Sequence, residues 1–371
     1  MRDLLGDLVR WHADSDGSDG GGTSGLATVV RTWRSAPRQP GASMAVSPSG
    51  EVVGSVSGGC VEGAVYDLAR EVTASGRPVL ATYGVSDDDA FAVGLTCGGV
   101  LEVFVEPLDA RRFPQLPQVA ESVAAGEAVA VATVVGGPGD VGAKLAVWAD
   151  RAAGGLGSRR LDDAVTDDVR GLLEQGVTTV AHYGPEGERR GDELAVFVES
   201  FAPPPRMIVF GAIDFAAAVA RVGKFLGYRV TVCDARPVFA TERRFPEADE
   251  VVVDWPHRYL AATRVDARTV ICVLTHDPKF DEPVLQVALR TQAAYVGAMG
   301  SRRTHADRLR RLREAGLTDA ELARLSSPIG LDIGARTPEE TAVSIAAEIV
   351  ASHWGGSGRR LTATEGPIHH P

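Results

Sequence analysis

The spacing of apolar residues along the chain predicts which segments are strands and which are helices. Over residues 1–12, apolar side chains recur at helical intervals and would share one face of a helix: Leu4, Leu5, Leu8 and Trp11. Residues 13–24 are rich in Gly, Ser and Asp, so residues 1–24 are predicted to form a helix followed by a flexible loop. The tail, residues 354–371, is predicted to be flexible as well.

An internal repeat occupies the next part of the chain. Four apolar segments return in the same order: 25–30 (GLATVV) as 130–135 (AVATVV), 41–46 (GASMAV) as 142–147 (GAKLAV), 80–84 (LATYG) as 180–184 (VAHYG), and 101–106 (LEVFVE) as 194–199 (LAVFVE). Each unit, about 25–107 and 128–200, is predicted to run strand, strand, helix, strand, strand. The first helix should cover residues 61–75, with Gly76 in a left-handed conformation after it. We expect the two units to form one α+β domain over residues 25–202.

A second kind of pattern follows Pro203-Pro204-Pro205. Apolar strands alternate with helices, at 207–211, 229–234, 250–254, 270–275 and 294–298. Thr318 with Glu321, and Thr337 with Glu340, have the spacing of capping boxes at helix starts. The fold class is therefore α/β: an N-terminal α+β domain made of an internal repeat, then a Rossmann-like, doubly wound parallel sheet over residues 203–353.

Composition narrows the class of protein further. The 371 residues carry a formal net charge of −11, which argues against a general nucleic-acid binder. No apolar run approaches the ~20 residues of a membrane helix, and the first residues do not resemble a signal peptide, so we expect a cytoplasmic protein without a membrane partner. The four cysteines, at 60, 97, 233 and 272, form no C-x-x-C pair, so neither a zinc ribbon nor a disulfide scaffold is expected.

Two cysteines lie beside paired glycines, in Gly58-Gly59-Cys60 and Cys97-Gly98-Gly99. Such glycines let the backbone approach a ligand and expose N–H donors. Cys60 also falls at the start of a predicted helix, whose dipole would lower the pKa of its thiol. The alternative is that both cysteines are small buried residues, as many unpaired cysteines are.

The repeat helps to choose between these interpretations. The second unit has Ser158-Arg159-Arg160 where the first has Gly58-Gly59-Cys60, and no cysteine in residues 189–193, the counterpart of 96–99. The fold can thus be built without either motif, which favours a functional role for Cys60 and Cys97. Cys233 and Cys272 lie within apolar strands and are predicted to be core residues.

Other candidate binding residues lie in loops. Arg38, in the loop 35–41, could hold phosphate, or simply be solvated. Gly211 and Asp234 have the spacing of a dinucleotide turn and its ribose-binding acid, but Ile213 and Asp214 replace what a pyrophosphate needs, so NAD(P) binding is doubtful. Further candidates follow later strands: His276, the turn Gly300-Ser301-Arg302-Arg303, and Asp332. We expect Arg308, Arg310, Arg311 and Arg313 to form a solvated helix face.

Four motifs in order resemble the XdhC/CoxI family, the accessory proteins of xanthine dehydrogenase and carbon monoxide dehydrogenase maturation. They are GSVSGGCVEGAV (54–65), GLTCGGVLEVFVEP (94–107), YVGAMGSRRTHADRL (295–309) and PIGLDIGARTPEETAVSIAAEI (328–349). The chain departs from the family at Ile213 and Asp214, where members often have glycine and histidine.

The resemblance implies a function and roles for single residues. It implies a factor that binds molybdenum cofactor (molybdopterin), assists its sulfuration and delivers it to an apo molybdenum hydroxylase, with a cysteine desulfurase as a second partner and a homodimer as the form in solution. Cys60 and Cys97, with their glycines, would handle the molybdenum centre or its terminal sulfur, for which soft thiolates are suited. The loop of Arg38 and the turn Gly300–Arg303 would hold the phosphate of the cofactor. Two alternatives stay open: an NAD(P)-linked oxidoreductase of the Rossmann type, and an adaptor that recruits the desulfurase.

Overall fold

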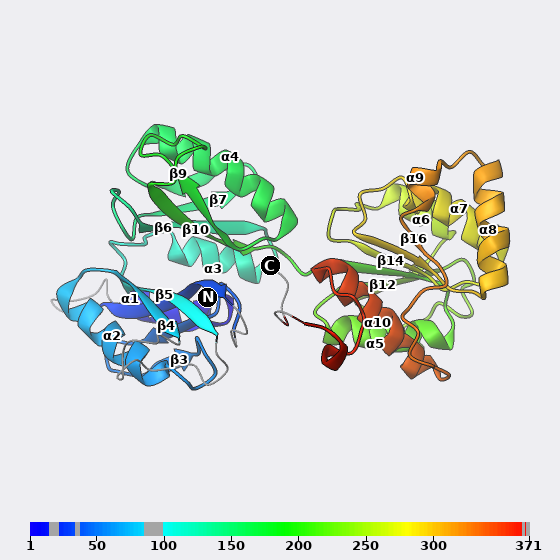
Figure 1. Cartoon of the computed structure of the whole chain (residues 1–371), viewed down its shortest axis with the longest axis horizontal. Helices are drawn as coiled ribbons and strands as arrows, with labels where there is room; N and C mark the ends of the chain where they lie inside the picture. The colour runs from blue at the N-terminus through cyan, green and yellow to red at the C-terminus, as the bar shows by residue number, and fades with distance from the viewer. Residues whose placement is uncertain (15–21, 34–37, 85–98, 366–367, 369–371) are drawn as a thin grey trace. The chain divides into compact units, whose positions relative to one another are not determined.

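The computed structural model describes residues 1–14, 22–33, 38–84, 99–365 and 368 (Figure 1). Contacts divide the chain into two compact units, Met1–Pro203 and a unit that begins at Pro204, and each is described by itself. None of the helices among the described residues is long and apolar enough to cross a membrane.

The first unit contains two antiparallel sheets of five strands. The first sheet, in the order β3-β2-β1-β5-β4, consists of β1 (Ser24–Trp33), β2 (Ser43–Val46), β3 (Val52–Gly54), β4 (Val79–Gly84) and β5 (Val100–Leu108). The second, in the order β8-β7-β6-β10-β9, consists of β6 (Val129–Gly136), β7 (Lys144–Trp148), β8 (Ala152–Gly154), β9 (Thr179–Tyr183) and β10 (Leu194–Phe201). One helix accompanies each sheet, α2 (Glu62–Ser75) and α4 (Arg159–Gln175). The segments that repeat in the sequence thus occupy equivalent strands, and each sheet gains a short strand, β3 or β8, that the pattern did not predict.

Apolar side chains determine where the helices of this unit lie. The N-terminal segment is a 3-10 turn (Arg2–Leu4) and the helix α1 (Leu5–Asp14), and its four apolar side chains are buried as predicted: Leu4, Leu5, Leu8 and Trp11. They pack against α3 (Leu116–Ala124), the helix between the two sheets. Helix α2 ends at Gly76 with a φ of 71°, which confirms the predicted left-handed cap.

The two repeats meet in a small apolar core, and a buried ion pair also connects them. Val30 and Phe104 of the first repeat pack with their counterparts Val135 and Phe197 of the second. Lys144 donates to Glu106 at 2.6 Å and to Thr133 at 3.0 Å, and both charged side chains are buried. The counterpart of Glu106 is Glu199, which accepts from the α-amino group of Met1 at 2.8 Å.

The second unit is a six-stranded parallel sheet in the order β13-β12-β11-β14-β15-β16. Its strands are β11 (Arg206–Phe210), β12 (Arg229–Asp234), β13 (Glu250–Val253), β14 (Val270–Val273), β15 (Tyr295–Ala298) and β16 (Leu325–Ser326). Its helices are α5 (Asp214–Phe225), α6 (Pro256–Ala262), α7 (Pro278–Ala288), α8 (Arg302–Glu314), α9 (Asp319–Leu322) and α10 (Pro338–Trp354), and a 3-10 turn (Leu361–Ala363) follows.

Helices cover both faces of this sheet, which confirms the predicted fold class. Helices α5 and α10 contribute to one apolar cluster, and α6, α7 and α8 contribute to another on the opposite face. Both capping boxes are present, at Thr318–Glu321 and Thr337–Glu340. The sixth strand, β16, has only two residues and was not predicted.

The Lys144–Glu106 pair gives a test of the packing between the repeats. In Lys144→Met, a side chain of similar length leaves the Glu106 carboxylate buried without its cation, so the free energy of unfolding should fall by about 3–5 kcal/mol. Lys224→Met removes the exposed partner of Asp249 and should cost less than about 1 kcal/mol. Denaturant unfolding of both variants measures the difference, and equal stabilities would contradict a structural role for the buried pair.

Candidate functional site

Cys60 lies in the thiol turn, residues 55–62, which connects β3 to the start of α2. Gly58 and Gly59 have φ values of 80° and 122°, a region that favours glycine. A Cβ atom added at either position would meet no atom within 4 Å, so the backbone path, and not close packing, requires these glycines. Gly58, Gly59 and Cys60 are all exposed, and the turn therefore presents the thiol at the surface of the unit.

The Glu62 carboxylate holds the thiol turn together by accepting its hydrogen bonds. Its Oε1 atom accepts hydrogen bonds from the Ser55 hydroxyl at 2.6 Å and from the N–H groups of Ser57 and Gly58 at 2.9 and 3.0 Å. Its Oε2 atom accepts from the Ser57 hydroxyl and from the Gly59 N–H at 2.8 Å. Partial burial acts to raise the pKa of Glu62, but the hydrogen bonds from Ser55 and Ser57 outweigh it and hold this pKa at about 2. Glu62 is therefore ionised across the physiological range.

This arrangement corrects the prediction that the glycines offer N–H donors to a ligand. The N–H groups of Gly58 and Gly59 donate to Glu62, and the N–H groups of Cys60 and Val61 donate to the Ser57 hydroxyl at 2.9 and 3.0 Å. Helix α2 begins two residues after Cys60, and the Glu62 carboxylate lies at its N-terminus. The N–H groups of the turn are thus used within it, while the residue Cys60 is exposed.

The second repeat shows the same scaffold without the thiol. Asp162, the counterpart of Glu62, accepts the Leu156 N–H at 2.7 Å. Helix α4 begins at Arg159, with Ser158 as its N-cap, so the positions equivalent to Gly59, Cys60 and Val61 are helical there. The helix of the first repeat thus begins later, at Glu62, and leaves Gly59 and Cys60 in the turn before it.

The other candidates of the first unit are less closely defined. Cys97 and Gly98 lie outside the described residues. Gly99 immediately precedes β5, and its carbonyl oxygen would lie 3.0 Å from a Cβ on Gly84. Arg38 is exposed in the loop between β1 and β2.

In the second unit, the predicted ribose-binding acid is already engaged. Gly211 makes the predicted tight turn, with a φ of 110°. The buried Asp234 carboxylate accepts from the Ala212 N–H at 2.7 Å, and from the Arg236 N–H and guanidinium at 2.8–2.9 Å. Although burial acts to raise the pKa of Asp234, the hydrogen bonds from Arg236 and Ala212 hold it below its usual range. Asp234 therefore braces the turn in this structure, and its role as a ligand-binding acid stays a prediction.

The remaining candidates of this unit follow the carboxyl ends of the parallel strands, or lie in the loop before α10. His276 is exposed after β14, and Asp332 is exposed in the loop. After β15, Gly300 leads into Ser301, which caps α8 by accepting the Thr304 N–H at 3.1 Å. Arg302 and Arg303 are exposed in the first turn of α8. Since carboxyl ends of neighbouring parallel strands share one edge of a sheet, His276 and the turn 300–303 lie at the same edge.

A buried arginine joins the loops at this edge, contrary to prediction. Arg308 is 1% exposed, whereas the sequence predicts it on a solvated face with Arg310, Arg311 and Arg313. It donates to Asp281 at 2.9 Å, to the Met299 carbonyl at 2.8 Å and to the Ser327 hydroxyl at 2.9 Å. Asp281 also accepts a hydrogen bond from Thr275. Burial raises the pKa of Asp281, against the opposing effect of these hydrogen bonds.

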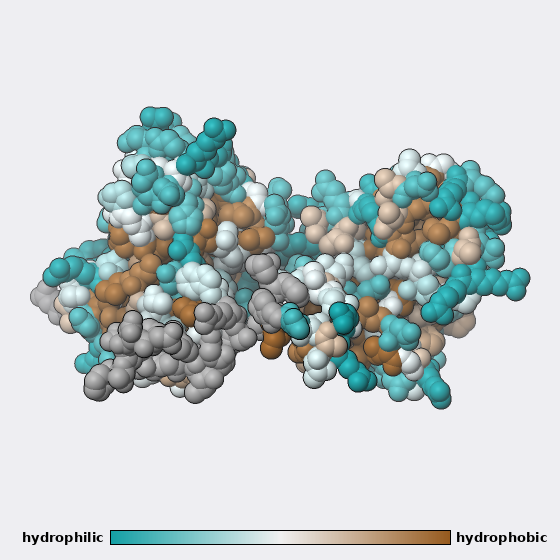
Figure 2. All heavy atoms as spheres, viewed as in Figure 1, coloured by the Kyte–Doolittle hydropathy of each residue, from teal (hydrophilic) through white to brown (hydrophobic). Residues whose placement is uncertain are grey.

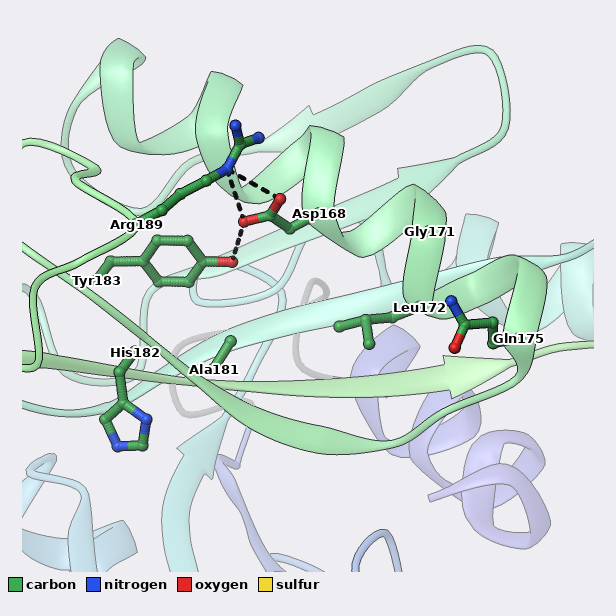
Figure 3. Close-up of a pocket in the computed structure, with 8 residues that line it drawn as sticks. All are labelled: Asp168, Gly171, Leu172, Gln175, Ala181, His182, Tyr183 and Arg189. Atoms are coloured by element: carbon green, nitrogen blue, oxygen red, sulfur yellow. Dashed lines mark hydrogen bonds and ion pairs between the residues drawn. The ribbon is translucent and has the colours of Figure 1, made fainter. Parts of the chain in front are cut away.

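Two cavities occur away from the predicted residues. One, of about 320 Å³, lies in the second repeat between α4 and β9, where Asp168 accepts hydrogen bonds from Tyr183 and Arg189 at 3.1 Å (Figure 3). The other, of about 350 Å³, lies at the amino edge of the parallel sheet and is lined by Arg206, Arg229, Glu250 and Tyr259, among others. Their polar side chains already bond one another, as Arg206 does with the Tyr259 hydroxyl at 3.1 Å.

The cysteines of the parallel sheet are core residues, as predicted. Cys233 and Cys272 are fully buried, and burial raises the pKa of each thiol to about 12. Cys233 and Cys272 pack in the two apolar clusters on either face of the sheet. Among the described residues, no group of three or more His, Cys, Asp or Glu side chains could hold a metal ion.

Glu62 is the residue of the site that sequence reasoning missed. Its signal was present in the repeat, since an acid stands at the equivalent position 162 although the residues between differ. The role of Arg308 had no comparable signal, because its partner Asp281 belongs to a different helix, 27 residues away.

Known proteins resemble the chain in both units. The model of the XdhC Rossmann domain matches residues 207–349, and the model of the XdhC and CoxI family matches residues 19–84 and 122–184. A Bacillus subtilis protein described as a probable subunit of xanthine dehydrogenase is 28% identical over 330 residues, covering 88% of this chain and 92% of its own length. The molybdenum cofactor insertion chaperone PaoD of Escherichia coli is 26% identical over 335 residues, covering 88% of this chain and 82% of its own.

A solved structure agrees with these sequence matches. The crystal structure of a protein described as a xanthine dehydrogenase from Bacillus halodurans is 26% identical, with a TM-score of 0.67, and the match covers 98% of this chain and 97% of the other. The motifs, the two family models and this fold together lead to one conclusion: the chain belongs to the XdhC/CoxI family.

Proposed function

We propose that this protein is a maturation factor for a molybdenum hydroxylase of the xanthine dehydrogenase type. It binds molybdenum cofactor as its cargo, assists sulfuration of the cofactor and delivers it to the apo-hydroxylase. The named relatives support the general role, since one is a cofactor insertion chaperone and another is described as part of a dehydrogenase. The observation that carries the residue-level proposal is the thiol turn, which the first repeat has and the second lacks.

Cys60 acts in this proposal as a sulfur ligand to the cargo. A thiolate is a soft donor, suited to molybdenum or to the sulfur attached to it. The turn holds Cys60 at the surface, so that a large cargo or the apo-hydroxylase can reach it without opening the fold. Cys97 is proposed as a second thiol for the same task.

Exposed arginines are proposed to hold the phosphate of the cofactor. Arg38, Arg302 and Arg303 are exposed, and guanidinium groups bind phosphate in a bidentate manner. The sulfur for sulfuration would come from a cysteine desulfurase partner, in the cytoplasm.

The alternative of an NAD(P)-linked oxidoreductase rests on the parallel sheet and the Gly211 turn. The engaged Asp234 counts against it, because a ribose hydroxyl would have to displace Arg236 and the Ala212 N–H. The adaptor alternative requires only a surface that binds the desulfurase, and it predicts a salt-sensitive association that survives loss of both thiols.

Of the predictions that follow from the proposed function, the first concerns Cys60. In a reconstitution from purified protein, molybdenum cofactor and apo-hydroxylase, Cys60→Ser should reduce the rate of hydroxylase activation at least 10-fold and weaken retention of molybdenum on this protein. Arg160→Ala, at the equivalent exposed position of the second repeat, should change neither. Activation and molybdenum content together are the measurement. Unchanged retention of molybdenum in Cys60→Ser would reject the thiol as a ligand.

The second prediction separates cargo binding from dinucleotide binding. Calorimetric titration with NADH or NADPH should give no binding heat up to millimolar ligand, because the ribose-binding acid is engaged by Arg236. Saturable binding that is lost on mutation of Asp234 would instead support the oxidoreductase alternative.

The third prediction concerns Glu62. In Glu62→Gln the amide NH₂ would face donors of the turn, so the free energy of unfolding at pH 7 should fall by about 1–3 kcal/mol. Since the folded pKa of Glu62, about 2, lies below the ordinary value near 4.3, this contribution is complete above the ordinary pKa and is lost as pH falls toward 2. The stability difference between wild type and Glu62→Gln should therefore narrow below about pH 4.

Glu71→Gln, an exposed change on the same helix, is the control and should leave stability nearly unchanged from pH 7 to pH 3. Thermal unfolding across this range measures all three proteins. A difference between wild type and Glu62→Gln that stays constant with pH would show that hydrogen bonding to an ionised Glu62 is not what stabilises the turn.

A further inference from the structure

Strand β9 lies at the edge of the second sheet and pairs with β10 alone among the described strands. Ser200 of β10 donates its N–H to the Thr178 hydroxyl at 3.1 Å, so every second residue of β10, counted from Ser200, directs its backbone polar groups at β9. Their partners are the odd-numbered residues of 179–183. The N–H and C=O groups of Val180 and His182 therefore point away from the sheet, and no other described residue makes a backbone hydrogen bond with them.

A groove runs along this free edge, between β9 and α4. Its cavity of about 320 Å³ is lined by one face of α4 and by β9. In Figure 3, Ala181 and Tyr183 extend toward the helix, whereas the ring of His182 points away from it, so His182 presents its backbone to the groove. Apolar atoms, drawn in brown, appear in Figure 2 in the region where Figure 1 draws β9 and α4.

Gly171 widens this groove at a cost to the helix that contains it. Glycine in the middle of a helix is destabilising relative to alanine. A Cβ atom at Gly171 would meet no atom within 4 Å, so packing within the unit does not require a glycine there. The repeat does not require it either, because the equivalent residue of α2 is Glu71. The missing side chain leaves room beside Leu172, which also lines the groove.

We propose that this groove binds an extended segment of the apo-hydroxylase, which joins the second sheet as an additional strand along β9. The outward N–H and C=O groups recur at every second residue, a pattern that another extended polypeptide matches. The space beside Leu172 takes a small apolar side chain of that segment. The far end of the groove demands no charge, because Asp168 is already paired with Arg189.

The inference rests on the proposed function, and it divides that function between the repeats. Delivery requires that the recipient be held during transfer, and a strand added to a sheet edge is held by main-chain hydrogen bonds. The first repeat presents the cargo thiol, and the second holds the recipient.

Binding of purified apo-hydroxylase to the full chain, measured by biolayer interferometry, tests the groove. Gly171→Leu fills the space and should raise the dissociation constant by about 10-fold or more, while its unfolding temperature stays at or above that of the wild type, because leucine is the better helix former. A purely structural role of Gly171 would not combine these two results. Gly6→Leu, at an exposed helical glycine of the same unit that also has open space around it, is the control and should bind as the wild type does.

A matched pair of variants at His182 tests the strand edge. His182→Pro removes the outward N–H and should weaken binding by about 10-fold, since proline is tolerated at a strand edge but cannot donate. His182→Ala keeps the N–H and should bind as the wild type does. In the wild-type complex, hydrogen–deuterium exchange of residues 179–183 should be slower than in the free protein, and this measurement depends on no variant.

The outcomes separate this inference from the proposed function. Activation by the wild type together with undiminished binding by Gly171→Leu, or unchanged exchange of residues 179–183 in the complex, would overturn the inference and leave the proposed function standing. A wild type that neither binds nor activates the apo-hydroxylase would overturn both. Loss of desulfurase or cofactor binding in Gly171→Leu, with binding of the apo-hydroxylase intact, would assign the groove to that other ligand and overturn the inference equally.

Discussion

The packing of the first unit depends on the buried pair of Lys144 and Glu106, where the two repeats meet. An ammonium group without a partner in this interior would cost several kcal/mol, so arrangements in which Lys144 faces Glu106 are favoured over shifted ones. The apolar contacts between the repeats also come from equivalent residues, Val30 with Phe104 and Val135 with Phe197. Because the repeated segments occupy equivalent strands, residues of the second repeat can be compared one by one with those of the first.

That comparison separates what the fold requires from what it does not. Both repeats place an acid, Glu62 or Asp162, at the start of the helix and use it to bind backbone N–H groups. Only the first repeat has a cysteine in this turn, and the N–H group of that cysteine donates to the Ser57 hydroxyl. The Glu62 carboxylate already lies at the positive end of the α2 dipole. The dipole by itself therefore does not explain why a cysteine stands at position 60. The first repeat differs from the second in carrying an exposed cysteine at this position.

The sequence predicted those features that follow from local periodicity or from spacing. Both strand patterns, the capping boxes and the buried Cys233 and Cys272 belong to this class. Strands of two or three residues, such as β3 and β16, are too short to show a period. The buried state of Arg308 depends on Asp281 from another helix, and the engagement of Asp234 depends on the rotamer of Arg236, and no pattern along the chain encodes either contact. The exposure of Cys60 follows from the conformation of the thiol turn, which no sequence pattern shows.

The second unit keeps the architecture of a dinucleotide fold but uses its key acid differently. Asp234 connects the Gly211 turn to Arg236 through hydrogen bonds, and Asp214 places a carboxylate at the start of α5. One strand away, Arg308 fixes the loops that carry Thr275, Met299 and Ser327. The exposed cations of this edge, Arg302 and Arg303, therefore extend from a fixed frame. An anionic group is better placed beside α8 than at the turn where a dinucleotide pyrophosphate would bind.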